Sequence, residues 1–204
     1  MPRPMDDAPY PPRTSMPSWP SQPGDLDIAA TSYTLFSLGE ADNAALRQWR
    51  RMLEDAGVPH DAVVVDAPYL ADWIEDLPRT MVPLAAGRRV GWRIAAAGEE
   101  AAVLAQAAAA CETGLLDVEL TLFVTDTRRI RVYCPHCKAH TLAAARPGSV
   151  VRCSGCALDL EVHPHLSLHT GMYLGTDRAA RERRRVRNSH ASEAAPEFQE
   201  ALHG

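Results

Sequence analysis

The sequence predicts an α/β protein with two lobes, a small parallel-sheet domain followed by a β-rich module built around four cysteines. Two observations carry this prediction. Between residues 30 and 125, short apolar runs alternate with segments of helical periodicity, an order typical of a parallel sheet covered by helices. Between residues 126 and 175, two C-x2-C pairs separated by 15 residues lie among short alternating strands, which indicates a metal site.

The composition divides the 204 residues into four segments. We expect a Pro-rich arm over 1–28, an α/β domain over 29–125, a zinc-ribbon-like domain over 126–175 and an Arg-rich polar tail over 176–204. Eight of the sixteen prolines fall within residues 1–26. Because proline fixes φ and removes a backbone donor, we expect the arm to be extended, and either disordered or laid along a partner, with disorder favoured.

Within the α/β domain, each expected element has a local reason. The helix over 99–113 is the clearest, because alanine is the best helix former, Glu99 and Glu100 suit the positive end of the helix dipole, and Gly114 closes it. A second helix runs from Asp42, its expected N-cap, to Ala56. A short helix covers 68–77. The expected strands are 32–38, 62–65, 90–96 and 119–124.

The parallel sheet raises the question of a nucleotide. A dinucleotide site needs a Gly-rich turn after the first strand, so that backbone amides reach the phosphates. The turn over 38–43 has one glycine and carries the carboxylates of Glu40 and Asp42, which would repel phosphate. The sequence also lacks the phosphate-binding loop G-x-x-x-x-G-K-[ST] and the nucleophile motif G-x-S-x-G. We therefore expect no catalytic residue and no cofactor-binding residue here.

The four cysteines are the expected metal ligands: Cys134, Cys137, Cys153 and Cys156. Four thiolates leave no open coordination position, which favours structural Zn²⁺. A module this small would draw much of its stability from the metal, roughly 10–16 kcal/mol in zinc-finger peptides. Iron, as a single ion or a [2Fe–2S] cluster, is the less favoured alternative, because Lys138 and Ala157 stand where rubredoxin-like sites place glycine. Two disulfides would suit an oxidising compartment, and no signal peptide precedes the domain.

Other candidate groups have weaker signals. His163, His165 and His169 follow the second cysteine pair, without the spacing of a helical metal site. They could bind metal or act as general bases, but hydrogen bonds that brace the ribbon are favoured. His136 is expected on the surface. Cys111 lies in the Ala-rich helical segment and is expected to be a small buried hydrophobe.

Charge and hydropathy exclude two classes of partner. The net charge is −5 and the apolar stretches are too short to span a bilayer, so we expect neither nucleic-acid nor membrane binding. Six arginines between residues 178 and 187 favour a solvated tail or a protein contact. The expected compartment is the cytoplasm.

The ribbon motifs resemble a known family. The segments 132–138, 151–156, 160–167 and 171–175 are similar to the DmmA-type small subunit of bacterial dimethylamine monooxygenase. The family's tail typically reads His-Phe-Ser-x-x-x-Gly-Ala-Tyr-Met-Gly. The matching positions are His165, Ser167, Gly171, Tyr173 and Gly175, whereas Leu166, Met172 and Leu174 are apolar replacements. Residues 90–124 are weakly similar to the nucleotide domain of ferredoxin reductases, with Ala95–Gly98 where those carry Cys-Gly-Pro.

This resemblance implies a subunit of a hetero-oligomeric enzyme that oxidises dimethylamine to methylamine and formaldehyde with O2 and NADPH. It implies a haem-containing catalytic subunit and a flavin and iron–sulfur reductase subunit as partners. The expected role is a non-catalytic assembly subunit that docks the two. The alternatives are an electron-transfer subunit with iron on the four cysteines, and a stand-alone zinc-ribbon adaptor.

Overall fold

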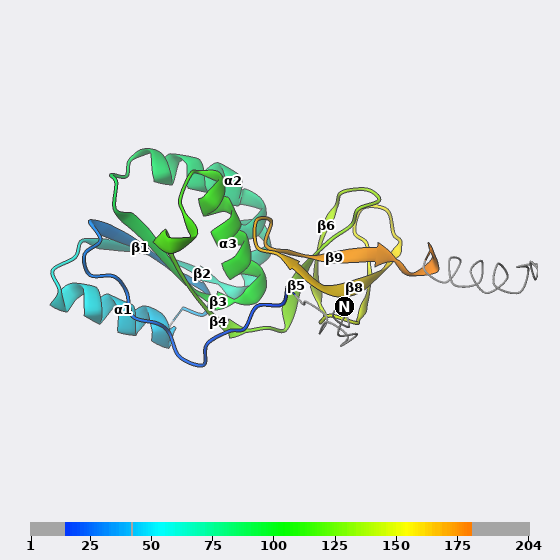
Figure 1. The fold of residues 1–204 in the computed structure, drawn as a ribbon, viewed down its shortest axis with the longest axis horizontal. Coiled ribbons are helices and arrows are strands. Elements are labelled where there is room, and N and C mark those ends of the chain that lie inside the picture. Colours follow the sequence, from blue (N-terminus) through cyan, green and yellow to red (C-terminus); the bar gives the residue numbers. More distant parts are fainter. Residues whose placement is uncertain (1–14, 42, 181–204) are drawn as a thin grey trace, which may run out of the picture.

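The computed structural model describes residues 15–41 and 43–180, which form two lobes joined side by side (Figure 1). The first lobe is an α/β domain. A four-stranded parallel sheet has the order β2-β1-β3-β4, in agreement with the predicted parallel sheet. Its strands are β1 (Ser32–Gly39), β2 (His60–Asp66), β3 (Trp92–Glu99) and β4 (Leu120–Asp126). Its helices are α1 (Ala44–Asp55), α2 (Leu70–Ala86) and α3 (Glu100–Glu112), with 3-10 turns at Ala67–Tyr69 and Asp117–Glu119.

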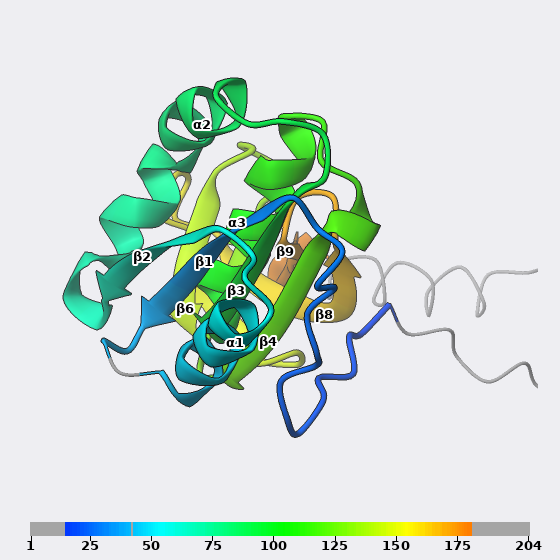
Figure 2. The same cartoon turned by 90° about the vertical axis from the view of Figure 1, so that its left-hand side faces the viewer.

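Helices cover both faces of this sheet (Figure 2). On one face, α1 packs Leu46, Trp49 and Leu53 against β1 and β3. On the other face, α2 and α3 bury a larger cluster that includes Leu77 and Met81. The central strands β1 and β3 are therefore apolar on both sides, as expected for a parallel sheet.

Most element boundaries shift by a few residues from the predictions, and two differences in the helices have a clear physical reason. The N-cap of α1 is Asn43 rather than Asp42: its side-chain oxygen accepts a hydrogen bond of 2.9 Å from the Ala45 N–H. Helix α2 continues to Ala86 instead of ending at residue 77. Pro78 lies on its exposed side, while Leu77 and Met81, four residues apart, are buried against the core. Tertiary packing thus outweighs the hydrogen bond that the proline removes.

The second lobe is a larger sheet than predicted. Five strands with the order β6-β5-β9-β8-β7 form it, where the sequence indicated only short alternating strands. They are β5 (Arg129–Tyr133), β6 (His140–Ala144), β7 (Val150–Arg152), β8 (Asp159–Ser167) and β9 (Met172–Asp177). All neighbours are antiparallel except β5 and β9. Strand β9 was missed because Met172–Asp177 lacks a strict alternation of apolar and polar residues.

Helix α3 lies between the two lobes. All its residues from Glu100 to Ala110 are buried, which fits a helix that is apolar on every side. The β8–β9 turn approaches its backbone at Gly171, where an added Cβ would lie 2.6 Å from the Leu104 carbonyl oxygen. Gly171 also has a φ of 63°. Only glycine allows this close approach, which seats the ribbon lobe on the helix.

Residues 15–28 of the predicted arm follow the body of the protein (Figure 1). Ser15 bridges to His165 on β8. Trp19 packs against the cores of both lobes, and Leu26 is buried in the cluster under α1. Disorder was therefore the wrong expectation for this stretch, because its apolar side chains find partners on the chain itself. Residues 1–14 lie outside the described residues.

Candidate functional site

The candidate metal centre is formed by two turns with the same backbone geometry. Cys134 and Cys137 follow β5, and Cys153 and Cys156 follow β7. In the first turn the Lys138 N–H donates to the Cys134 carbonyl, and the Cys134 N–H donates to the Ala139 carbonyl. The second turn repeats both bonds at Ala157, Cys153 and Leu158. Each turn therefore presents its two cysteine side chains in the same way.

Each turn also contains a residue in the left-handed region. The φ angles are 63° at Lys138 and 57° at Ala157. Non-glycine residues adopt this region at a cost of order 1–3 kcal/mol and only when the surrounding structure enforces it. Neither position is glycine, which counted against iron in the sequence, yet both turns adopt this backbone conformation. The two turns therefore contain local strain that the surrounding contacts and any bound ion must offset.

The four sulfurs converge on one point. Cys134 Sγ lies 3.8 Å from Cys156 Sγ, and Cys137 Sγ lies 3.5 Å from Cys153 Sγ. All four lie within 4.8 Å of one another. A tetrahedral ion with Zn–S bonds of about 2.3 Å requires sulfur separations of about 3.8 Å, whereas a disulfide requires about 2.05 Å. The cluster thus has the size and the soft donor set that a tetrahedral thiolate-bound ion needs, and these four residues could hold a metal ion.

Backbone N–H groups near the sulfurs favour the thiolate form of two of the cysteines. The backbone N–H of Cys156 lowers the pKa of the Cys153 thiol to about 6, with a further contribution from the N–H of Gly155 and against burial, which raises it. The N–H of Leu158 acts similarly on Cys156, but burial and the neighbouring thiols raise the pKa of that group. Because the thiolate is the metal-binding form, the pre-formed N–H donors favour ligation.

The three histidines do not approach the cluster as a group. His163 Nε2 lies 2.6 Å from Thr176 Oγ1, across the β8–β9 pair. His165 Nδ1 lies 2.9 Å from Ser15 Oγ, which links β8 to the arm. Both contacts fit the bracing role, and both partners are side-chain hydroxyls. His169 lies in the exposed β8–β9 turn and His136 is exposed beside Cys137. Cys111 is partly exposed, with its thiol 3.6 Å from Asp117 Oδ1.

A second group of polar residues lies where nucleotides bind in this class of sheet. In open parallel sheets that place is the carboxyl ends of the strands at the point where the strand order reverses, here between β1 and β3. Near the end of β3, Gly98 lies so close to β1 that an added Cβ would be 1.9 Å from the Leu38 carbonyl oxygen. The chain then presents Glu99 and Glu100 at the start of α3. Carboxylates at a helix N-terminus oppose phosphate binding.

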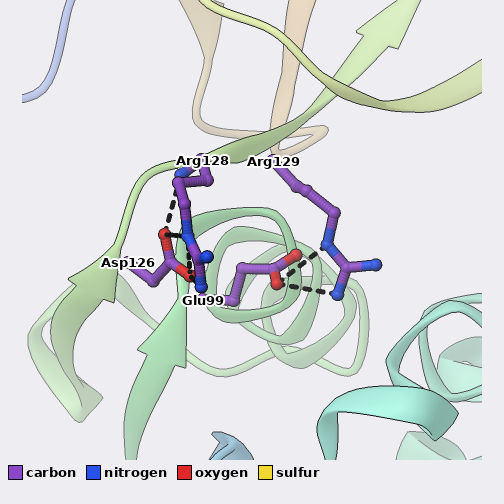
Figure 3. A network of polar contacts seen from close by, with 4 residues as sticks. All are labelled: Glu99, Asp126, Arg128 and Arg129. Atoms are coloured by element: carbon purple, nitrogen blue, oxygen red, sulfur yellow. Dashed lines mark hydrogen bonds and ion pairs between the residues drawn. The ribbon is translucent and has the colours of Figure 1, made fainter.

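The ribbon lobe pairs with both carboxylates. Arg129, at the start of β5, donates to Glu99 Oε2 from Nε (2.9 Å) and Nη2 (2.7 Å), as Figure 3 shows. The Glu99 side chain is only 9% exposed. Next to it, Arg128 pairs with Asp126 at the surface, where the arginine side chain is 87% exposed. The connection between the lobes therefore contains one buried and one exposed ion pair.

Glu100 accepts a hydrogen bond from a residue of β9. The Tyr173 hydroxyl donates to Glu100 Oε1 at 2.6 Å, and Glu100 is 3% exposed. Burial raises the pKa of the Glu100 carboxyl, although the Tyr173 hydroxyl and the Trp19 side chain lower it. Burial and the neighbouring carboxyl raise the pKa of Tyr173 in turn. Three distant segments, the arm, α3 and β9, thus meet at this carboxyl.

The four predicted ligands are therefore together, and the motif residues Gly171 and Tyr173 lie at the contact between the lobes. The sequence did not indicate the roles of Glu99, Glu100 and Arg129 in that contact. Acidic residues are favoured at the start of any helix, so the sequence explains Glu99 and Glu100 even if nothing contacts them. Only the structure, with the ribbon lobe in place, identifies their role in the contact. A weak signal was available, because Arg129 begins a strand that must lie next to the end of β4.

The fold and the site define an α/β protein that carries a docked ribbon with a four-cysteine cluster. Residues 131–176 match the C-terminal domain of the family described as dimethylamine monooxygenase subunit DmmA-like. A curated relative, the heme-dependent oxidative N-demethylase delta subunit of Ectopseudomonas mendocina (strain ymp), is 30% identical over 165 residues, which cover 79% of this chain and 86% of that protein. The chain belongs to this family of DmmA-like oxidative N-demethylase subunits.

No solved structure matches the chain. Within residues 15–41 and 43–180, no helix has the length and apolar character needed to cross a bilayer.

Proposed function

We propose that this chain is a non-catalytic assembly subunit of a haem-dependent oxidative N-demethylase that acts on dimethylamine with O2 and NADPH. Its relative is a delta subunit of a heme-dependent N-demethylase, which supports a role within a multi-subunit enzyme. In this proposal the haem lies on one partner, and flavin and an iron–sulfur cluster lie on a reductase partner. The chain holds these two partners at electron-transfer distance in the cytoplasm.

One observation carries the assembly role. The carboxyl ends of β1 and β3, where a nucleotide would bind in this class of sheet, carry Glu99 and Glu100, and both are paired with the ribbon lobe. The reductase-like sheet thus uses its ligand-binding edge to attach a second lobe. This arrangement supports the proposal that the α/β domain contacts other proteins and does not bind a cofactor.

We propose Zn²⁺ as the metal of Cys134, Cys137, Cys153 and Cys156. The sulfur separations and the all-thiolate donor set support a closed tetrahedral site. When bound, such an ion supplies folding free energy and no chemistry on substrate. The two cysteine turns and the strands that carry them then present a fixed surface, which an adaptor between two larger subunits needs.

Reconstitution tests the proposal. The tagged chain is co-expressed with candidate haem and reductase subunits, and the purified complex is assayed for formaldehyde release from dimethylamine with NADPH. We expect all three to co-purify, with turnover that falls at least tenfold when this chain is omitted and recovers when it is added back. Full turnover by the two partners without the chain, or a chain that never associates with the haem protein, would overturn the assembly role.

A further inference from the structure

A cavity of about 900 Å³ lies between the two lobes. Its apolar wall comes from α2 and α3, through side chains such as Ile74, Leu77 and Ala108. Its other wall is the face of the ribbon sheet formed by β5, β6, β8 and β9. Cavities of roughly 300–1,000 Å³ with apolar walls and a few polar groups are typical of small-molecule sites. Neither the metal cluster nor the Glu99–Arg129 contact uses this space.

Arg131 is the fixed positive charge of the cavity. It lies two residues after Arg129 on β5, so both side chains leave the same face of the strand. Arg129 reaches a carboxylate, that of Glu99, with two hydrogen bonds. Arg131 instead donates one hydrogen bond, of 3.2 Å, to the Thr170 carbonyl oxygen. Within residues 15–41 and 43–180 it forms no ion pair.

This placement of Arg131 is costly unless an anion joins it. Burial lowers the pKa of Arg131, and Glu112 opposes that effect from a longer distance. A guanidinium has five N–H donors in a planar fork that matches a carboxylate. A desolvated cation with most of those donors unused is stabilised by a carboxylate more than by any neutral group.

The remaining lining narrows the choice of anion. Tyr133 and His140 form a tilted ring pair beside Arg131, with centroids 6.2 Å apart. Burial and the charge of Arg131 lower the pKa of His140, so its imidazole is neutral at pH 7. The exposed Glu75 and Glu112 also line the cavity and would repel a multiply charged ligand such as a phosphate ester. The charges of the lining therefore favour a ligand with one negative charge over a ligand with several.

We propose that this cavity binds a small monocarboxylic acid, with its carboxylate on Arg131 and its apolar body against Ala108 and Leu77. The site is independent of the metal centre and of the assembly role. It gives the subunit a ligand of its own, in a cavity lined by both lobes and by the helix between them.

Calorimetric titration of the full-length, metal-loaded chain tests this site, with octanoate as the probe and octanol and octyl phosphate for comparison. We expect octanoate to bind and the other two to bind at least tenfold more weakly. Arg131→Gln should weaken octanoate binding roughly 10- to 100-fold, the range for losing hydrogen bonds to a charged group. Arg128→Gln, which changes an exposed arginine outside the cavity, should leave the affinity unchanged.

A second variant locates the apolar body. Ala108→Phe, which places a ring in the cavity, should abolish octanoate binding while the chain keeps its metal. Equal affinity for octanoate and octanol in the unmodified chain would overturn the carboxylate assignment even if the variants failed to fold. Octanoate binding that survives Ala108→Phe, or no detectable binding of octanoate at all, would overturn the site.

Discussion

The buried ion pair between the lobes permits a quantitative prediction. Arg129 and Glu99 are joined by two hydrogen bonds, and the glutamate side chain is 9% exposed. Arg129→Met would leave the Glu99 carboxylate buried without its cation. The other oxygen of this carboxylate, Oε1, already has no hydrogen-bond partner among residues 15–41 and 43–180. Removing one partner of a buried pair costs about 3–5 kcal/mol. Because Arg129 is 33% exposed and water can enter, we expect a loss of about 2 kcal/mol.

Urea denaturation of the metal-loaded chain measures this loss. With an m-value of about 2 kcal/mol/M, the midpoint should fall by about 1 M. The double variant Arg129→Met with Glu99→Gln should recover at least half of the loss, because both charges are then removed and no uncompensated ion stays buried. The double-mutant cycle thus separates the pair from the general packing of the two side chains.

The neighbouring exposed pair provides the matched control (Figure 3). Arg128 is 87% exposed, so Arg128→Met should change the free energy of unfolding by no more than about 0.5 kcal/mol. If Arg128→Met and Arg129→Met cost the same, or if the double variant is as unstable as Arg129→Met alone, burial of Glu99 is not what makes the contact stabilising.

Three other changes have defined outcomes. Cys137→Ser should unfold the ribbon and abolish assembly, whereas Cys111→Ser should have little effect on either. Far-UV circular dichroism measures the folding and co-purification measures the assembly. If the chain tolerates both substitutions equally, Cys137 is not a metal ligand. Gly171→Ala should destabilise by roughly 1–3 kcal/mol in thermal melts, since its Cβ would strike the Leu104 carbonyl and its φ is positive. Glu100 has a raised folded-state pKa, so its contribution to stability is fully present below its unfolded pKa and is lost as pH rises through its folded pKa. Glu100→Gln should remove that pH dependence of the free energy of unfolding. If the variant and the unmodified chain have the same profile of stability against pH from pH 4 upward, the role assigned to Glu100 is wrong.

The parts of the fold that follow from local patterns were predictable. The buried strands and α3 are marked by apolar runs and by alanine content, and the four ligands by the spacing of two cysteine pairs. The end of α2 was not predictable, because Pro78 and Pro83 favour a break locally, whereas the burial of Met81 and the packing of Leu84 against the core favour a longer helix. Strand β9 pairs with β5 and β8, so its existence depends on partners distant in sequence.

The contact between the lobes was hidden for the same reason. Glu99 and Glu100 satisfy the helix dipole whether or not a second lobe is present, so their partners leave no mark on local sequence. The packing of residues 15–28 was not visible in the sequence because proline content describes the backbone alone. Trp19 and Leu26 supply the apolar area that fixes residues 15–28 to the body.

Metal analysis of the purified complex, paired with the visible spectrum of this chain alone, tests the central claim most directly. The sulfur geometry predicts about one zinc per chain, no visible absorbance, and loss of both the metal and the association with the haem subunit on chelation. Stoichiometric iron, with a colour that bleaches on addition of dithionite, would instead make the four cysteines a redox centre and contradict a purely structural ribbon.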